Sequence, residues 1–324
     1  DKFVDANIAN YEVTKTALGK DQSGTYDLVE YDFKPKKWDR LILLTSGMHA
    51  YEVGSIFGLA YFLNDVVNNY ANDELLTYLH EHVRIKVIPM INPWGYSQNP
   101  KSYVQSRGVN INRNFDIDGK WAEYNPGSNP NNNKGTAPFS EAETQILRQW
   151  ASENYGAEFW IDCHTSVGNY TINKEIYTYS LSTCPYASKI AAAQEALEAW
   201  TKEYYNLQSV STKYVLDSDG SLKQYWYEGT YNLPMFIIEQ CTSCEAIGIT
   251  VNGDKDSFVN YTALIYGFVG QFLLRQDIVV VSNKYIEKLQ QTAIEDKKYL
   301  APLNTTPPTP PTPPTPTVWN STAE

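Results

Sequence analysis

The sequence predicts an α/β fold: an α/β/α sandwich with a central mixed, mostly parallel twisted sheet. Two observations carry this prediction. Short apolar runs, too brief for helices, recur along the chain, and segments with apolar residues at helical spacing alternate with them. Because such apolar runs are typical of strands buried on both faces, we expect the sheet to lie between two layers of helices.

The predicted elements follow one another in a regular order. They are a strand at residues 40–45, a helix at 53–68, a strand at 83–91, a helix at 140–155, a strand at 159–163, a helix at 186–206, a strand at 235–238 and a helix at 259–274. Ser140 and Glu143 have the spacing of a helix N-cap and its capping-box partner. Residues 1–30 are polar and turn-rich, and no element is predicted there. Residues 119–135, rich in Asn, Gly and Pro, predict a surface loop.

Length and composition indicate one large domain followed by a tail. The chain has 324 residues, 42% of them hydrophobic, which suffices to bury a large core. We expect a single catalytic domain over residues 1–300, with its core at about 38–275. Thr-Pro-Pro repeats in residues 301–324 predict an extended linker that leads into a further, truncated module. A modular protein of this kind is expected to be secreted, at the cell surface or in a virion.

The charge balance argues against nucleic acid as a partner. Lys and Arg number 26 against 37 Asp and Glu, which gives a net charge of −11, and no basic cluster stands out. A membrane span is not expected either, because no apolar stretch approaches the roughly 20 residues that a spanning helix needs. We therefore expect a soluble protein.

The four histidines of the chain fall into two pairs. His49 and His164 each follow a predicted buried strand, which is where α/β folds place their sites. Glu52 lies three residues after His49, a spacing that lets both side chains reach one metal ion. Two His and one carboxylate leave the fourth position of a tetrahedral zinc open for water, as in catalytic zinc sites. His80 and His82, at a helix end, are better explained as solvated polar residues.

Two further segments place polar residues in apolar surroundings. Asn112 and Arg113 lie side by side in a half-apolar segment, and burying Arg is costly without an anion. A guanidinium beside an amide donor suits a carboxylate, such as the C-terminus of a peptide. Glu239 ends the apolar strand at 235–238, where it is either a structural ion-pair partner or a general base.

Taken together, these segments resemble the zinc carboxypeptidase family in wording and in chain order. The matching elements are Gly-x-His-x-x-Glu, Gly-Val-x-x-Asn-Arg-Asn-Phe, Ser-Glu-x-Glu-Thr before a strand, Asp-x-His-x-Ser, and a strand ending in Glu. The resemblance implies one Zn²⁺ per chain, bound by His49, Glu52 and His164. It also implies that the terminal carboxylate of a peptide substrate is held by Asn112 and Arg113.

The resemblance further implies a hydrolytic mechanism and its remaining residues. Glu239 would activate the catalytic water. An Arg upstream of the Asn-Arg pair would polarise the scissile carbonyl, and Arg107 is the candidate. A Tyr that covers the substrate is expected before the catalytic Glu, and Tyr214 is the candidate, with three later tyrosines as competitors. Asn110 stands where the family has Asp, a change expected to weaken a contact that orients the metal ligands.

The expected function is zinc-dependent hydrolysis of peptide bonds, as a carboxypeptidase that releases C-terminal residues. Three alternatives stay open. The enzyme could act on bacterial cell-wall peptides, which the Pro-rich tail makes attractive. It could be an amidohydrolase for N-acyl amino acids, of the desuccinylase or aspartoacylase branch. The domain could also be an inert binding module in a larger surface or virion protein.

Overall fold

A computed structural model of the chain describes residues 11–165, 173–177, 223–231, 233, 235–241, 265 and 269–270. The predicted helix at 186–206 and the predicted linker at 301–324 lie outside these residues. Of the predicted helix at 259–274, Ile265, Val269 and Gly270 are described, and all three are helical.

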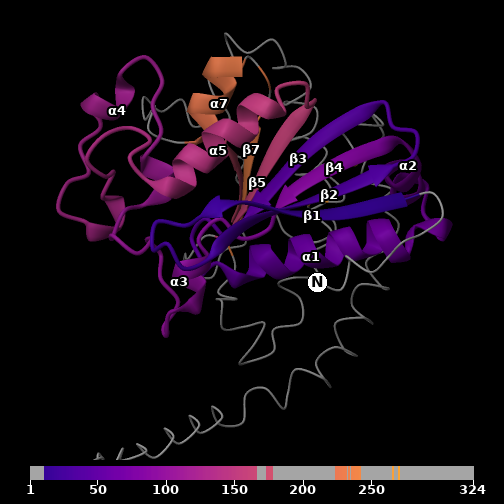
Figure 1. Cartoon of the computed structure of the whole chain (residues 1–324), viewed down its shortest axis with the longest axis horizontal. Coiled ribbons are helices and arrows are strands. Elements are labelled where there is room, and N and C mark those ends of the chain that lie inside the picture. The colour runs from indigo at the N-terminus through magenta and orange to yellow at the C-terminus, as the bar shows by residue number, and fades with distance from the viewer. Residues whose placement is uncertain are drawn as a thin grey trace, which may run out of the picture.

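A seven-stranded mixed sheet forms the centre of the described part of the chain (Figure 1). Its spatial order is β1 (Tyr11–Lys20), β2 (Asp27–Pro35), β4 (Val83–Ile88), β3 (Arg40–Ser46), β5 (Phe159–His164), β7 (Met235–Cys241) and β6 (Asn173–Tyr177). β4, β3, β5 and β7 run parallel to their neighbours in this group, while β1, β2 and β6 pair antiparallel. The predicted mixed, mostly parallel sheet is confirmed, and its parallel strands form the centre.

Helices cover both faces of this sheet (Figure 1). On one face lies α1 (Val53–Asn68), whose Ser55 hydroxyl is 3.0 Å from the hydroxyl of Ser46 on β3. On the other face lie α5 (Ala142–Glu153) and α7 (Lys223–Tyr231). The remaining helices are α2 (Glu74–His82), α3 (Pro93–Ser97), α4 (Lys120–Glu123) and the 3-10 turns η1 (Tyr70–Asn72), η2 (Ile111–Arg113) and η3 (Pro130–Asn132). The predicted α/β/α arrangement is thus confirmed.

Single residues explain two of the element boundaries. The predicted helix at 53–68 coincides with α1. β4 ends at Ile88, three residues before the predicted end, because Pro89 has no backbone N–H to donate to a neighbouring strand. Helix α2 begins where the Asp73 side chain accepts a hydrogen bond from the N–H of Leu76, which satisfies one of the free donors of the first turn.

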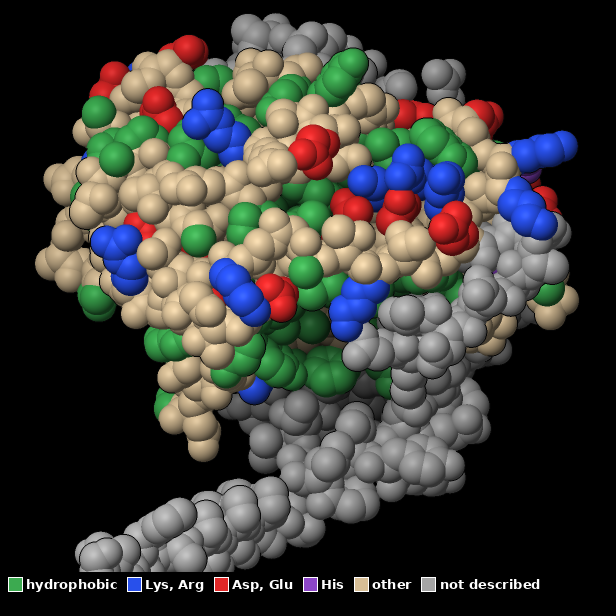
Figure 2. Space-filling model, viewed as in Figure 1, with side chains coloured by type: hydrophobic (Ala, Val, Ile, Leu, Met, Phe, Trp, Pro, Cys, Tyr) green, Lys and Arg blue, Asp and Glu red, His purple; other side chains and the backbone are tan. Residues whose placement is uncertain are grey.

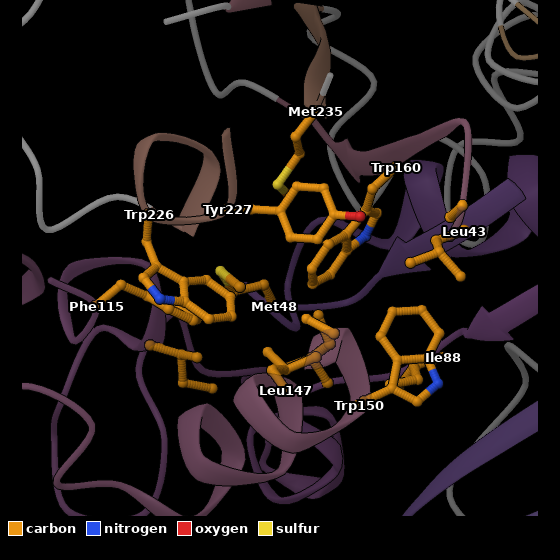
Figure 3. Packing of buried hydrophobic residues seen from close by; sticks show 14 residues of the cluster. Leu43, Met48, Ile88, Phe115, Leu147, Trp150, Trp160, Trp226, Tyr227 and Met235 are labelled. Atoms are coloured by element: carbon orange, nitrogen blue, oxygen red, sulfur yellow. The ribbon is translucent and has the colours of Figure 1, made fainter. Parts of the chain in front are cut away.

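An apolar cluster fills the space between the sheet and the layer of α5 and α7 (Figure 3). Trp160 on β5 belongs to this cluster. Its ring packs edge to face against Trp150 of α5 and Tyr227 of α7, with ring centroids 5.2 and 5.0 Å apart. Since alternate residues of a strand point to opposite faces, Asp162 and His164 share the face of Trp160. Polar side chains thus follow Trp160 toward the carboxyl end of β5, and a functional site can form there.

The N-terminal hairpin is the main difference from the sequence-based prediction. Residues 1–30 lack an apolar pattern, yet β1 and the start of β2 lie there and pair antiparallel. β1 carries a run of exposed polar side chains, and Val13 is its buried residue. β1 pairs with β2 along its length and buries few apolar side chains, so hydrophobic periodicity does not reveal it.

The capping box predicted at Ser140 and Glu143 is wrong. The helix begins at Ala142 with Glu141 as N-cap, and the Ser140 hydroxyl donates to the carboxylate of Glu141. Glu143 turns inward, where it accepts the backbone N–H of Gln22 at 3.0 Å. The Gln22 amide oxygen in turn accepts the N–H of Ala142 at 2.8 Å. The β1–β2 turn therefore caps this helix from a distant part of the chain.

The prediction that His80 is solvated is also wrong. Its side chain is buried, with Nδ1 3.0 Å from the carbonyl oxygen of Val66 and its ring stacked on Tyr70. The side chain of His82 is 50% exposed. His80 is thus a hydrogen-bonded core residue that joins α2 to α1.

On the face seen in Figure 2, basic side chains lie in separate groups, several of them beside acidic ones. The prediction against a nucleic-acid partner continues to rest on the net charge of −11. Among the described helices, none combines the length and the apolar character that crossing a bilayer requires.

Candidate metal centre

Three residues able to hold a metal ion meet at the carboxyl ends of parallel strands. His164 ends β5, His49 lies three residues beyond β3, and Glu52 directly precedes α1. One ligand atom from each lies within 4.8 Å of the other two, and all three side chains are buried. On the next strand, β7, Glu239 is the register partner of His164.

A glycine turn carries the chain from β3 to His49. Gly47 has a φ of 67°, a left-handed conformation that residues with a side chain rarely adopt. A Cβ atom there would meet Met90 Sδ at 2.8 Å and the backbone of Met90 at 3.1 Å. The Gly47 carbonyl oxygen accepts the N–H of Asn92 at 2.9 Å. The glycine of the Gly-x-His motif is therefore required by close backbone packing.

The two imidazoles present the same ring nitrogen to the carboxylate of Glu52. His49 Nδ1 is 2.8 Å from Oε1, and His164 Nδ1 is 3.1 Å from Oε2. His164 Nδ1 is buried and makes no hydrogen bond of acceptable geometry with any described residue. A second carboxylate contact is the backbone N–H of Thr165, which donates to Oε2 at 2.9 Å.

The opposite ring nitrogens are held by acceptors. His49 Nε2 is 3.2 Å from the amide oxygen of Asn110, and His164 Nε2 is 2.7 Å from Asp162 Oδ2. Such acceptors keep the proton on Nε2 and leave the Nδ1 lone pair for a metal. Two inward imidazole nitrogens and one carboxylate form a donor set that suits Zn²⁺. The residues present therefore fit a zinc ion.

The electrostatics of the cluster also favour a cation. Burial raises the pKa of Glu52, but the nearby His49 and His164 outweigh it and lower the pKa to about 2. Burial lowers the pKa of His164, but the carboxylates of Asp162 and Glu52 outweigh it and raise the pKa to about 10. Burial lowers the pKa of His49. The carboxylates thus create a negative potential at His164 that a bound cation would compensate.

Tyr103 covers the cluster from one side. Its ring stacks on that of His49, with centroids 3.8 Å apart and an interplanar angle of 18°. The ring of Tyr51 lies 5.4 Å from that of Tyr103. Tyr103 was not predicted from the sequence, because one tyrosine among 25 carries no distinguishing pattern.

Asn112 and Arg113 lie on η2, close to the metal-ligand cluster. The amide oxygen of Asn110 connects η2 to the metal-ligand cluster. It accepts the N–H of Asn112 at 2.9 Å and lies 3.2 Å from His49 Nε2. The Asn112 side chain is almost fully buried. Arg113 Nε donates to the hydroxyl of Tyr124 at 3.2 Å.

A buried ion pair lies behind His164. Lys223, the first residue of α7, places Nζ 2.7 Å from Asp162 Oδ2, and both side chains have no exposed surface. Thr45 donates to Asp162 Oδ1 at 2.6 Å and lies 3.3 Å from the lysine nitrogen. The sequence analysis missed Lys223. A buried Asp on an apolar strand was the available signal, because a carboxylate there requires a cationic or hydrogen-bonding partner.

The remaining predicted residues occupy different places. Arg107 has a side chain that is 52% exposed and lies 3.9 Å from the carboxylate of Glu141, and no described contact joins it to the metal ligands. Glu239 lies on β7, where its backbone is described and its side chain is not. Tyr214 lies outside the described residues. Their proposed roles stay predictions.

Comparison with known proteins supports the assignment of the fold and the family. A sequence model described as zinc carboxypeptidase matches residues 18–268. An inactive metallocarboxypeptidase ecm14 of Talaromyces stipitatus is 26% identical over 168 residues, which is 45% of this chain and 27% of that protein. The protein of the same description from Sclerotinia sclerotiorum is 27% identical over 167 residues, 46% of this chain and 26% of its own. The match thus spans about a quarter of these relatives.

Solved structures share the fold. Thrombin activatable fibrinolysis inhibitor has a TM-score of 0.62 at 16% identity, over 88% of this chain and 70% of that one. Carboxypeptidase A from Helicoverpa armigera has a TM-score of 0.64 at 14% identity, over 89% of this chain and 70% of that one. At such identities the likeness concerns the fold alone.

Proposed function

Because this chain belongs to the zinc carboxypeptidase family, we propose that it is a zinc-dependent peptidase that releases residues from the C-terminus of peptides. The family predicted from the sequence motifs is confirmed by the match over residues 18–268. The observation that carries the proposal is the convergence of His49, Glu52 and His164, whose Nδ1 atoms and carboxylate face one another in a buried site.

A zinc ion bound there would supply a polarised water and a Lewis acid for the scissile carbonyl. The protein's own residues would do the rest. Asn112 and Arg113 would bind the terminal carboxylate through an amide donor and a guanidinium. Glu239 would accept a proton from the water and pass it to the leaving amine. The position of its backbone opposite His164 supports this role.

Two roles complete the proposal. Arg107 would polarise the scissile carbonyl, for which it must leave its contact with Glu141. Tyr214 would cover the bound substrate. The substrate class is a peptide with a free C-terminal carboxylate, and cell-wall peptides and N-acyl amino acids are alternatives that belong in the same screen.

A second candidate function is peptide binding without hydrolysis. Two observations favour it. The fungal relatives carry the description inactive. In addition, the side chain that stacks on His49 is the uncharged Tyr103, and the guanidinium of Arg107 lies near Glu141 instead of the metal ligands. In this alternative the protein would hold zinc and a peptide carboxylate but lack a cation at the scissile carbonyl.

Metal analysis is the first test of the proposal. The purified protein should carry about one zinc per chain, and a His164→Ala variant should carry almost none because one of three ligands is lost. His80→Ala is the matched control, since His80 is also buried but lies outside the cluster. Absence of zinc from the parent protein, even after zinc is supplied, would contradict both candidate functions.

Peptide hydrolysis then separates the two candidates. A set of N-acetylated peptides should be cleaved at the last bond, and their C-terminal amides should not. Glu239→Gln should lower kcat by about 100-fold or more while zinc is retained, because it removes the general base. Zinc binding with preference for the free acid but no cleavage would favour the binding protein over the peptidase.

A further inference from the structure

Lys223 is an unusual residue for a protein interior. It begins α7, and its side chain has no exposed surface. Its ammonium nitrogen is 2.7 Å from Asp162 Oδ2, 3.3 Å from Thr45 Oγ1 and 4.8 Å from the centroid of the Trp160 ring. The amine is thus matched by one carboxylate, one hydroxyl and one aromatic face.

Stability alone is a weak explanation for this ion pair. Removing two charges from water is energetically costly, and apolar side chains of the same volume often stabilise a core equally well. The pair does connect two places. Asp162 Oδ2 is shared between Lys223 Nζ and His164 Nε2, each at 2.7 Å. The carboxylate of Asp162 therefore links Lys223 to the metal ligand His164.

The backbone of the same lysine reaches the predicted carboxylate site. Its N–H donates to the amide oxygen of Asn112 at 3.2 Å. With the oxygen engaged, the donor end of this amide is left for another group, and no described residue accepts from its nitrogen. A terminal carboxylate needs such a donor.

From these contacts we propose that Lys223 is a positioning residue that fixes the Asn112 amide at a set place relative to the metal ligand His164. The side chain anchors the first turn of α7 to Asp162, and the backbone N–H of that turn orients the amide. This inference rests on the proposed function, in which Asn112 binds the carboxylate of the substrate. It makes the lysine a determinant of preference for free C-termini without contact to the substrate.

The expected effect of removing the anchor is selective. In Lys223→Met the apolar stem remains, but the ammonium that holds the turn against Asp162 is gone. The amide of Asn112 can then rotate, and a free carboxylate loses one oriented hydrogen bond, worth about a 10-fold change in affinity. An amidated peptide has no carboxylate for this site, so its affinity should stay the same.

A second variant separates positioning from folding. Lys223→Met leaves the Asp162 carboxylate buried without its cation, which is strongly destabilising. In the double variant Lys223→Met/Asp162→Asn no buried charge is unpaired, and the new amide oxygen can still accept from His164 Nε2. The double variant should therefore recover much of the melting temperature but keep the weakened binding of the free acid.

Binding is measured in the zinc-loaded protein, by calorimetry with acetyl-Ala-Ala-Phe and its C-terminal amide. All proteins carry Glu239→Gln so that no turnover occurs, and zinc content is determined for each. Lys120→Met is the matched control, because Lys120 also pairs with a carboxylate at 2.7 Å but is exposed. Hydrolysis by the parent protein is assayed separately, so a protein without activity still yields these affinities.

Three results would overturn the inference. The first is a double variant that binds the free acid as tightly as the Glu239→Gln parent. The second is an equal loss of affinity for acid and amide, which is what a purely structural lysine predicts. The third is a parent that does not prefer the acid, since Asn112 would then not bind a carboxylate. A weaker acid affinity with an unchanged amide affinity, at full zinc content, supports it.

Discussion

Replacing Glu143 by Gln should stabilise the protein above neutral pH. The carboxyl group of Glu143 is buried; one oxygen accepts the N–H of Gln22, and the other has no hydrogen-bond partner among the described residues. Burial, together with the charges of Asp21 and Glu141, raises its pKa from 4.5 to about 7. The folded protein therefore holds this proton more tightly than the unfolded chain does.

The direction and the size of the change in stability follow from the difference in pKa between the folded and the unfolded state. Between pH 4.5 and 7 the folded state binds more protons than the unfolded state, so the contribution of Glu143 to stability is largest at low pH and is lost as pH rises. The shift corresponds to about 3 kcal/mol by pH 8. A Gln at this position keeps the acceptor for Gln22 and cannot ionise. We expect it to raise the free energy of unfolding by about 1–3 kcal/mol at pH 8, with little change at pH 4.5.

Urea unfolding of the parent and of Glu143→Gln at pH 4.5, 6 and 8 measures this effect. Glu153→Gln serves as the control, because Glu153 lies on the same helix with an exposed side chain. A gain for Glu143→Gln that is the same at all three pH values would contradict the electrostatic reasoning. So would equal stability of the two proteins at pH 8.

Substitutions at three further positions test the metal centre. Gly47→Ala should lower the free energy of unfolding by about 1–3 kcal/mol and lower the zinc content, because the left-handed φ and the contact with Met90 both oppose a Cβ atom. Urea unfolding measures the first effect and metal analysis the second. Asn110→Ala should weaken zinc binding about 10-fold in chelator competition and Asn110→Asp should not, because His49 Nε2 loses its acceptor only in the first. Tyr103→Ala should weaken zinc binding about 2–10-fold by loss of the stacked ring, whereas Tyr103→Phe should leave it unchanged.

The centre of the fold could be predicted from the sequence because its physical signal is local. β3, β5 and β7 each contain a short apolar run, and α1 has apolar residues at helical spacing. The metal-ligand cluster was predictable for the same reason, since His164 ends such a strand and His49 lies three residues beyond another. Parallel strands bring their carboxyl ends to one edge, so position along the chain was enough to place both residues there.

The parts that the sequence analysis missed depend on partners distant in the chain. Helix α5 is capped by Gln22, which lies 120 residues before Ala142, so no local pattern reveals it. His80 was predicted as a solvated residue at a helix end, but it is buried and its Nδ1 lies 3.0 Å from the carbonyl oxygen of Val66 on another helix. Lys223 pairs with an Asp on another element. In each case a polar residue is explained by a contact that only the folded chain creates.

The N-terminal hairpin sets a limit on how far the domain can be shortened. The sequence places the start of the core near residue 38, but β2 pairs with β4 at Tyr31, Asp32 and Phe33, and β1 pairs with β2. A version beginning at residue 38 would expose the hydrogen-bonding edge of β4, whose backbone N–H and C=O groups could then pair with a second molecule. β1 instead ends the sheet with Lys15 and Lys20, charged side chains that discourage such pairing. Engineered forms of this domain should therefore retain the hairpin to avoid association through an exposed strand edge.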